Sequence, residues 1–186
     1  MGESSPLVEL VDRAVGDGGG VEHIVDTLRS QLCALIRSGA VQLPERLGRP
    51  HGDHYARRLL HRDEQRGYSI IAMTWGARQG TSLHDHAGLW CVESVWQGSI
   101  EVLQFEMVER QTDGLFRFEK RGSMQAGIGS AGCLIPPHEY HMIRNPTEEP
   151  AVSVHIYGGD MTFCNVFEDR GGGWFQRREK PLGLDE

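Results

Sequence analysis

The sequence predicts a mainly β protein, a sandwich or barrel of antiparallel strands with helices packed against it. From residue 68 onward, many short segments rich in Val, Ile, Tyr, Phe and Trp follow one another at nearly regular spacing. Turn residues separate these segments, for example at 112–114, 127–132 and 136–137. The chain also holds 24 glycines and 8 prolines, a content that fits many strands and turns better than a helical protein.

The 186 residues are expected to form one domain with three parts, because no internal repeat or linker divides them. Residues 1–50 are predicted as a helical cover, residues 55–168 as the β core, and residues 169–186 as a C-terminal tail. In the tail, Trp174 and Phe175 are expected to pack on the core before the chain frays.

Two helices are predicted in the cover, over residues 6–14 and 21–38. Apolar residues recur at helical spacing in both, and a glycine run follows the first while Gly39 follows the second. In the core, the segment 54–61 carries two arginines directly before the strand region. Strands are then predicted over residues 68–75, 80–86, 89–96, 99–109, 115–120, 132–135, 141–144, 151–157 and 161–167.

Charge and composition exclude several kinds of partner. The net charge of −7 argues against nucleic acid and anionic membranes, which both bind basic surfaces. No apolar run approaches the roughly 20 residues of a membrane-spanning helix. The first five residues are polar and acidic, unlike a signal peptide, and the scattered cysteines form no CxxC pair. We therefore expect a cytoplasmic protein; its oligomeric state stays open.

Candidate metal ligands stand out in the segment 81–86. On a regular strand His84 and His86 point to the same face while Asp85 points away, and two neutral imidazoles so placed form half of a metal site. His141, which opens an apolar strand, is preferred as the third ligand over His138. Glu93 is a further candidate. Four other histidines lack such spacing and are expected at the surface: His23, His51, His54 and His61.

Two stretches resemble the paired motifs of the cupin superfamily, whose members are small jelly-roll barrels with a metal in the barrel mouth. The first contains Gly80, His84, His86 and Gly98, and the second contains His141 followed by an asparagine four residues later. The resemblance implies a cupin-type jelly-roll barrel with the N-terminal helices packed on it. It also implies that His84, His86 and His141 bind the metal.

One difference from the usual cupin motif narrows the resemblance to a single family. Where most cupins carry a metal-binding glutamate, this chain has Cys91. With that change, residues 55–168 resemble the cysteine dioxygenase family of thiol dioxygenases. The resemblance implies an Fe(II) cofactor, O2 and L-cysteine as substrates, and a role in cysteine catabolism. It assigns the substrate carboxylate to Arg57 with Tyr55, and it makes Cys91 the partner of a thioether bond to a tyrosine, here Tyr157.

The residues support this chemistry. Three histidines without a carboxylate leave the full +2 charge on the iron, which favours binding of a thiolate together with an oxygen species. Both oxygen atoms then go to sulfur and give a sulfinic acid. Ser153, His155 and Tyr157 alternate along one predicted strand and so face the same way. We expect them to form a relay that holds the Tyr157 hydroxyl near the iron.

Two alternatives stay open. The first is oxidation of 3-mercaptopropionate or another small thiol carboxylate. That branch typically has glutamine in place of Arg57 and glycine after the tryptophan that here precedes Cys91, which favours L-cysteine, although Trp90 itself and the segment 59–63 are closer to the other branch. The second is a cupin that binds a metal but does not catalyse an oxidation, and that acts as a sensor or an isomerase.

Overall fold

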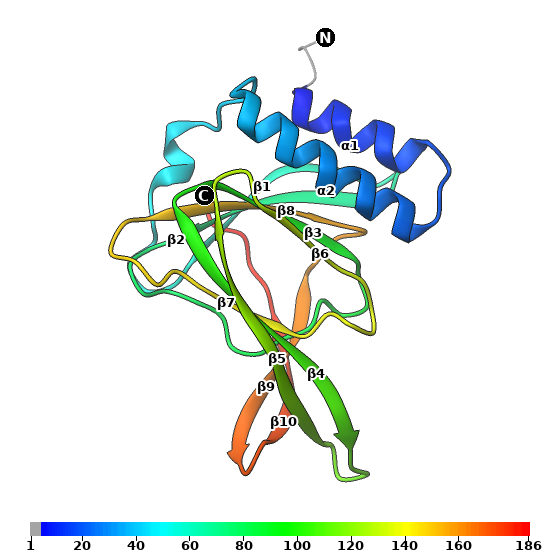
Figure 1. Ribbon diagram of the computed structural model, residues 1–186, viewed down its shortest axis with the longest axis vertical. Helices are drawn as coiled ribbons and strands as arrows, with labels where there is room; N and C mark the ends of the chain where they lie inside the picture. Colours follow the sequence, from blue (N-terminus) through cyan, green and yellow to red (C-terminus); the bar gives the residue numbers. More distant parts are fainter. Residues whose placement is uncertain (1–4) are drawn as a thin grey trace.

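The computed structural model describes residues 5–186 and shows two five-stranded antiparallel sheets packed face to face, with two helices on the outer face of one sheet (Figure 1). The helices are α1 (Pro6–Gly16) and α2 (Val21–Ser38), followed by a 3-10 turn, η1 (Glu45–Gly48). The first four residues, on which the expectation about a signal peptide depends, lie outside the described part.

Each sheet mixes strands from distant parts of the chain. The first sheet has the order β1 (Ala56–Asp63), β2 (Tyr68–Trp75), β8 (Ala151–Tyr157), β3 (Cys91–Gln97), β6 (Ala131–Leu134). The second has the order β7 (His141–Arg144), β4 (Ser99–Arg110), β5 (Leu115–Gly127), β10 (Trp174–Pro181), β9 (Phe163–Gly171). This arrangement confirms the predicted mainly β, jelly-roll fold with N-terminal helices packed on it.

The helices bury their apolar stripes on the first sheet. Leu28 and Leu32 of α2 are fully buried and pack, with residues of α1, against Ile70 of β2 and Val154 of β8. Helix α2 ends at Gly39, which adopts the left-handed conformation that favours glycine. A hydrogen bond of 2.7 Å from the Tyr68 hydroxyl to a carboxylate oxygen of Asp12 fixes α1 on β2. No helix within residues 5–186 is long and apolar enough to cross a membrane.

Because helices cover one face of the first sheet and the second sheet covers the other, β2 and β8 are buried along their whole length. Alternate residues therefore have different surroundings. In β2, Ile70 contacts the helices, whereas Ile71 and Met73 face the interior between the sheets. The same alternation in β8 directs Tyr157 into this interior, together with the polar side chains two and four residues before it.

Three predicted segments differ from the structure. The stretch with two arginines is itself a strand, β1, which pairs with β2. Its polar residues conceal the alternation of apolar and polar side chains that would predict a strand. The segment 80–86 is not a regular strand, since it makes only isolated bridges to β7 and β9. Strand β5 continues to Gly127, beyond the predicted end at residue 120, in a long hairpin with β4 that projects from the body (Figure 1).

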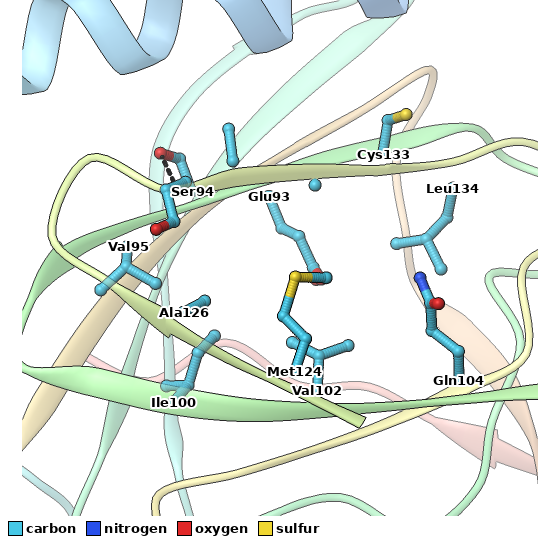
Figure 2. Close-up of a pocket in the computed structure, with 13 residues that line it drawn as sticks. Glu93, Ser94, Val95, Ile100, Val102, Gln104, Met124, Ala126, Cys133 and Leu134 are labelled. Atoms are coloured by element: carbon cyan, nitrogen blue, oxygen red, sulfur yellow. Dashed lines mark hydrogen bonds between the residues drawn. The ribbon is translucent and has the colours of Figure 1, made fainter. Parts of the chain in front are cut away.

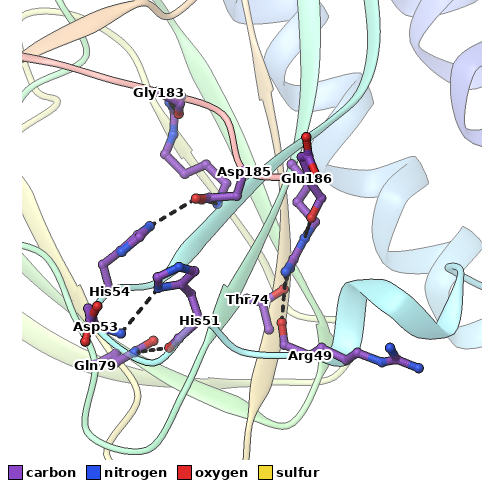
Figure 3. Close-up of polar contacts among 11 residues, drawn as sticks. Arg49, His51, Asp53, His54, Thr74, Gln79, Gly183, Asp185 and Glu186 are labelled. Atoms are coloured by element: carbon purple, nitrogen blue, oxygen red, sulfur yellow. Dashed lines mark hydrogen bonds and ion pairs between the residues drawn. The ribbon is translucent and has the colours of Figure 1, made fainter.

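The C-terminal tail does not fray as expected. Strand β10 pairs with β9 over eight residues and with β5, because its residues fit the exposed edges of both strands. The chain then returns along β1, where the Asp185 amide donates to the Arg57 carbonyl and a carboxylate oxygen of Asp185 accepts the Arg57 amide at 2.8 Å. The end of the chain therefore lies beside the first strand (Figure 3).

The helical cover should contribute measurably to stability. We expect Leu28→Ala to lower the free energy of unfolding by roughly 2–5 kcal/mol, because it leaves a cavity between α2 and the first sheet. Urea denaturation measures this change. The exposed Ser30 on the same helix provides the control, since Ser30→Ala should change stability by less than about 0.5 kcal/mol. Equal stabilities of the two variants would contradict the packing described here.

Candidate active site and metal centre

Three histidines meet in the interior near one end of the barrel. His84 and His86 lie in the connection between β2 and β3, and His141 begins β7. The Nε2 atom of His141 lies 3.2 Å from Nε2 of His84 and 3.1 Å from Nε2 of His86. All three side chains are buried, and their candidate ligand atoms lie within 4.8 Å of one another. The structure therefore brings together the three histidines that the sequence singled out.

Backbone contacts on both sides hold the segment that carries His84 and His86. His84 exchanges two backbone hydrogen bonds with His141, at 3.1 and 3.2 Å, and also bridges to β9. Gly80 lies so close to β7 that a Cβ atom there would approach the Ile143 carbonyl oxygen to 2.7 Å. Asp85 points away from the cluster, as expected, and accepts hydrogen bonds from the backbone and side-chain amides of Asn165. The segment is irregular because it connects the edges of two different strands.

The protonation of the cluster suits a metal ion. The Nδ1–H group of His84 donates a hydrogen bond to the Ser82 carbonyl at 3.0 Å. Nε2 of the same neutral ring is therefore unprotonated, and its lone pair points toward the other two rings. Burial lowers the pKa of His84 to about 4 and the pKa values of His86 and His141 well below the usual value, so all three rings are neutral near pH 7. Nε2 of His84 and Nε2 of His86 each lie within 3.2 Å of Nε2 of His141, so the three rings could hold one ion between them.

Sequence reasoning missed Glu139, which supports the cluster from outside. Its carboxylate accepts the backbone N–H of His86 at 3.0 Å. Burial raises the pKa of Glu139 to about 7, against the lowering effect of this hydrogen bond. The neighbouring His138, the rejected alternative for the third ligand, is exposed and is not part of the three-histidine group. The one indication of this role in the sequence is that Glu139 lies two residues before His141.

The cluster borders a small pocket between the sheets. Arg57 and Tyr55, the predicted carboxylate-binding residues, line this cavity together with Tyr157 and the three histidines. The Tyr55 ring stacks on the ring of Trp75 at a centroid distance of 4.7 Å. Thus β1, which the sequence did not identify as a strand, supplies one wall of the cavity.

Arg57 is buried, and two of its five N–H groups are already used. Nη1 donates to the Gly183 carbonyl at 2.7 Å and Nη2 donates to the Met161 carbonyl at 3.2 Å. Its Nε–H is buried without a partner in the described structure. The two carbonyls fix the guanidinium plane, and the remaining N–H groups are free to bind an anion.

The chain that follows β10 is held in place close to this arginine. Asp185 accepts the Arg57 amide through one oxygen, and its other oxygen lies 3.1 Å from Nε2 of His54 (Figure 3). The rings of His54 and His51 lie 4.0 Å apart, so two histidines that were expected to be isolated surface residues form an exposed group with Asp185. This group anchors the tail beside the cavity.

Cys91 and Tyr157 are direct neighbours on β3 and β8. They are paired in the register of the two strands, and opposite side chains in such a pair lie about 4.5–5.5 Å apart at Cβ. Both are buried, and burial raises the pKa of the Cys91 thiol and of the Tyr157 hydroxyl well above their usual values. The ring of Tyr157 also meets the ring of His86 edge-on at 5.5 Å. Both groups therefore keep their protons beside the cluster.

Ser153 and His155 face the same interior, and they form a hydrogen bond of 2.8 Å between Ser153 Oγ and His155 Nε2. Trp75 Nε1 donates to the same hydroxyl oxygen at 2.8 Å. The ring centre of His155 lies 6.1 Å from that of Tyr157 in a stacked arrangement, and its Nδ1 faces Glu93 instead. Of the expected relay, the link between Ser153 and His155 is present, whereas the described residues show no hydrogen bond from His155 to Tyr157, because His155 Nδ1 faces Glu93.

Glu93 lies behind His141 and not among the three converging Nε2 atoms. Its nearest oxygen is 3.9 Å from His141 Nδ1, on the opposite side of the ring. Burial raises the pKa of Glu93 to about 7. Glu93 also borders a second cavity of about 480 Å³ between the sheets, and it is the one charged side chain in that lining (Figure 2). This second cavity is lined by no histidine.

Comparison with known proteins identifies relatives of the chain. A sequence-family profile described as "Cysteine dioxygenase type I" matches residues 47–170. Cysteine dioxygenase type 1 from Rattus norvegicus is 25% identical over 119 residues, which cover 63% of this chain and 58% of the relative. The proteins of the same name from Danio rerio and Homo sapiens are 28% and 26% identical, with the same coverage. The match thus spans less than two thirds of the length of these relatives.

Part of the chain is also similar to solved structures. An RmlC-like cupin protein from Desulfovibrio desulfuricans is 19% identical, with a TM-score of 0.46, and the match covers 64% of this chain and 97% of that protein. A conserved protein with a double-stranded β-helix domain from Klebsiella pneumoniae is 14% identical, with a TM-score of 0.48, covering 65% of this chain and 85% of that protein.

The three histidines should be required for metal binding. We expect alanine at position 84, 86 or 141 to strip divalent metal from the purified protein, since each change removes one of three ligands. The fold should persist, because other side chains form the core. Elemental analysis measures the metal and circular dichroism the fold. The control, His138→Ala, should keep its metal. Retention by His141→Ala combined with loss by His138→Ala would show that the third ligand is assigned wrongly.

Proposed function

The chain belongs to the cysteine dioxygenase type I family, and from that premise we propose that it is an Fe(II)-dependent thiol dioxygenase that oxidises L-cysteine with O2 to cysteine sulfinic acid. One observation carries the proposal. A buried group of three neutral histidines opens on the same small cavity as a buried arginine with an unpartnered N–H. A molecule with a thiol at one end and a carboxylate at the other fits such a pair.

The proposed metal ligands are Nε2 of His84, His86 and His141. Bound there, iron(II) would supply the positive charge that favours a thiolate at neutral pH and the capacity to activate O2. The overall reaction conserves its atoms, because one thiol and one O2 give one sulfinic acid, so no external reductant is needed. The three rings fit this role since none carries a positive charge that would repel the ion.

Arg57 is proposed to bind the substrate carboxylate. A guanidinium offers paired donors in one plane, and the bonds to two backbone carbonyls hold that plane fixed before the substrate enters. Tyr55 borders the same side of the cavity, and its pKa is raised by burial, so its hydroxyl remains a donor. The carboxylate would thus be held by donors that require no rearrangement.

Tyr157 is proposed to act at the other end of the substrate. Its hydroxyl keeps its proton near pH 7, because burial raises its pKa, and it can donate a hydrogen bond to groups bound at the histidine cluster. Cys91, opposite Tyr157 on β3, would fix the ring if the thioether bond forms. These roles concern orientation and hydrogen bonding, which support chemistry that the metal supplies.

L-cysteine is preferred over 3-mercaptopropionate because position 57 holds arginine and the tryptophan before Cys91 is not followed by glycine. The two substrates differ in the amino group that only L-cysteine carries. Oxygen uptake by the iron-loaded protein distinguishes them. We expect uptake on addition of L-cysteine, with one sulfinic acid formed per O2 consumed. Faster turnover of 3-mercaptopropionate would favour the other branch, and no uptake with any thiol would favour a sensor or an isomerase.

Arg57 provides a sharper test. We expect Arg57→Lys to lower kcat/KM for L-cysteine by about 10- to 100-fold, because lysine keeps the charge but loses the planar pair of donors, a loss of about 1.5–3 kcal/mol. Steady-state oxygen uptake measures it. Arg62→Lys is the matched control, since Arg62 lies on the same strand with its side chain paired to Asp160 at the surface. An unimpaired Arg57 variant would contradict the carboxylate role.

The thioether prediction concerns Cys91 and Tyr157. When the Cys91 sulfur joins the Tyr157 ring carbon beside the hydroxyl, one S–H and one C–H bond are lost, and O2 would accept the two electrons and two protons to give H2O2. Mass spectrometry of tryptic peptides should show a joined pair that is lighter by two hydrogens and increases with turnover. Cys91→Ser should lower the rate modestly, and Tyr157→Phe should lower it more by removing the hydroxyl. Cys91 that is still fully alkylated after prolonged turnover would refute the cross-link but not the dioxygenase.

A further inference from the structure

Glu93 has surroundings that none of the roles described above explains. It lies on β3 and is paired with His155 in the register of β3 and β8, and its side chain is buried. Its two oxygens face two different histidines: Oε1 lies 3.9 Å from Nδ1 of His141, and Oε2 lies 3.6 Å from Nδ1 of His155. Within the described residues, these are its only ion-pair contacts.

Three of the four atoms that face each other here are also without a hydrogen-bond partner. His141 Nδ1, His155 Nδ1 and Glu93 Oε2 are all buried and without a hydrogen bond in the described structure. Buried polar atoms without partners are costly, and native proteins rarely keep three of them side by side. Shortening the separations of 3.9 Å and 3.6 Å by roughly 0.7–1.2 Å would bring both pairs to the length of charge-assisted hydrogen bonds, about 2.7–2.9 Å. Glu93 can therefore satisfy all three.

The direction of the hydrogen bonds can be derived for His155. Trp75 Nε1 is only a donor, so Ser153 Oγ accepts from it. The single hydroxyl proton of Ser153 then goes to Nε2 of His155 at 2.8 Å, since no other acceptor for it is recorded in the described part of the chain. With Nε2 accepting, the ring proton of neutral His155 must lie on Nδ1, where it points toward Glu93.

The same reasoning applies to His141 if it binds the metal through Nε2. Its proton is then on Nδ1, which faces the other oxygen of Glu93. We propose that Glu93 is a positioning residue whose carboxylate accepts Nδ1–H of both His141 and His155, and so joins a metal ligand to the residue that orders Ser153. The inference rests on the proposed three-histidine centre and adds to it an outer carboxylate.

A carboxylate is the side chain that this position requires. It presents two acceptor oxygens in one plane, one for each N–H, whereas the amide of glutamine presents one acceptor and one donor. Strand β6 leaves room for it, because the residue opposite Glu93 on that side is Gly132. A carboxylate behind a ligating histidine fixes the ring, selects the tautomer and increases the basicity of the metal-bound nitrogen.

The experiment compares the parent protein with Glu93→Leu, which removes both acceptors, and Glu93→Gln, which keeps the shape and one acceptor. We expect the dissociation constant for Co²⁺, measured by competition with a chelator, to rise 10- to 100-fold in Glu93→Leu and to a smaller extent in Glu93→Gln. Glu101→Gln is the matched control, because Glu101 pairs with Arg144 on the second sheet and should leave the constant unchanged. Circular dichroism checks that each variant is folded.

A second readout is independent of the metal. In the metal-free protein, ¹⁵N NMR of labelled histidines should show the Nδ1–H tautomer for His155 in the parent. In Glu93→Leu the Nδ1–H group of His155 should lose its acceptor, so its ¹H and ¹⁵N resonances should shift, while Ser153 still donates to Nε2. Co²⁺ binding within twofold of the parent in both variants, or a His155 Nδ1–H resonance that is unchanged in Glu93→Leu, would overturn the proposal. Neither readout depends on thiol oxidation, so absence of dioxygenase activity in the parent would refute the proposed function and leave this result intact.

Discussion

The pairing of β3 with β8 is the constraint on which the site depends. Its register sets Cys91 opposite Tyr157, Glu93 opposite His155 and Val95 opposite Ser153. A shift by one residue would turn each of these side chains toward the helices and bring apolar residues of both strands into the cavity. The helices, which bury the outer face of the same strands, stabilise this register because such a shift would place polar groups in their apolar interface.

Burial then determines the charge of the site. With helices on one side and a second sheet on the other, the histidines near the cavity lose the solvation that would stabilise their protonated forms, and their pKa values fall. The same desolvation keeps the thiol and the phenol protonated. The histidine cluster is therefore a set of neutral rings, with the Arg57 guanidinium beside the cavity and the Glu93 carboxyl group behind His141. Neutral imidazole nitrogens that converge in this way are suited to bind a cation.

Much of the fold and of the candidate site could be predicted from local sequence patterns. Features that depend on contacts between distant segments could not. The spacing of His84 and His86, the asparagine four residues after His141, and the alternation of Ser153, His155 and Tyr157 are local signals, and they predicted the fold and most residues of the candidate site. By contrast, the strand β1, the docked tail and the contacts of Glu93 and Glu139 depend on pairing between distant segments. The periodicity of apolar residues and the composition carry no information on such pairing. From the sequence, Glu93 is therefore a candidate only as a metal ligand. The segment 80–86 was assigned to a strand because its sequence alternates, although bridges to two different strands keep it irregular.

The contact between the tail and β1 has a consequence for the order in which the protein can be completed on the ribosome. Arg57 is synthesised early, but the carbonyl that fixes its Nη1 belongs to residue 183 and the carboxylate that binds its amide belongs to residue 185. The barrel strands up to β9 can pair before these residues emerge. The cavity wall beside Arg57 thus acquires its final form only after residues 183–185 have emerged. Premature termination shortly before residue 183 would therefore yield a protein with its barrel strands and its three histidines present but with the Arg57 guanidinium held by the Met161 carbonyl alone.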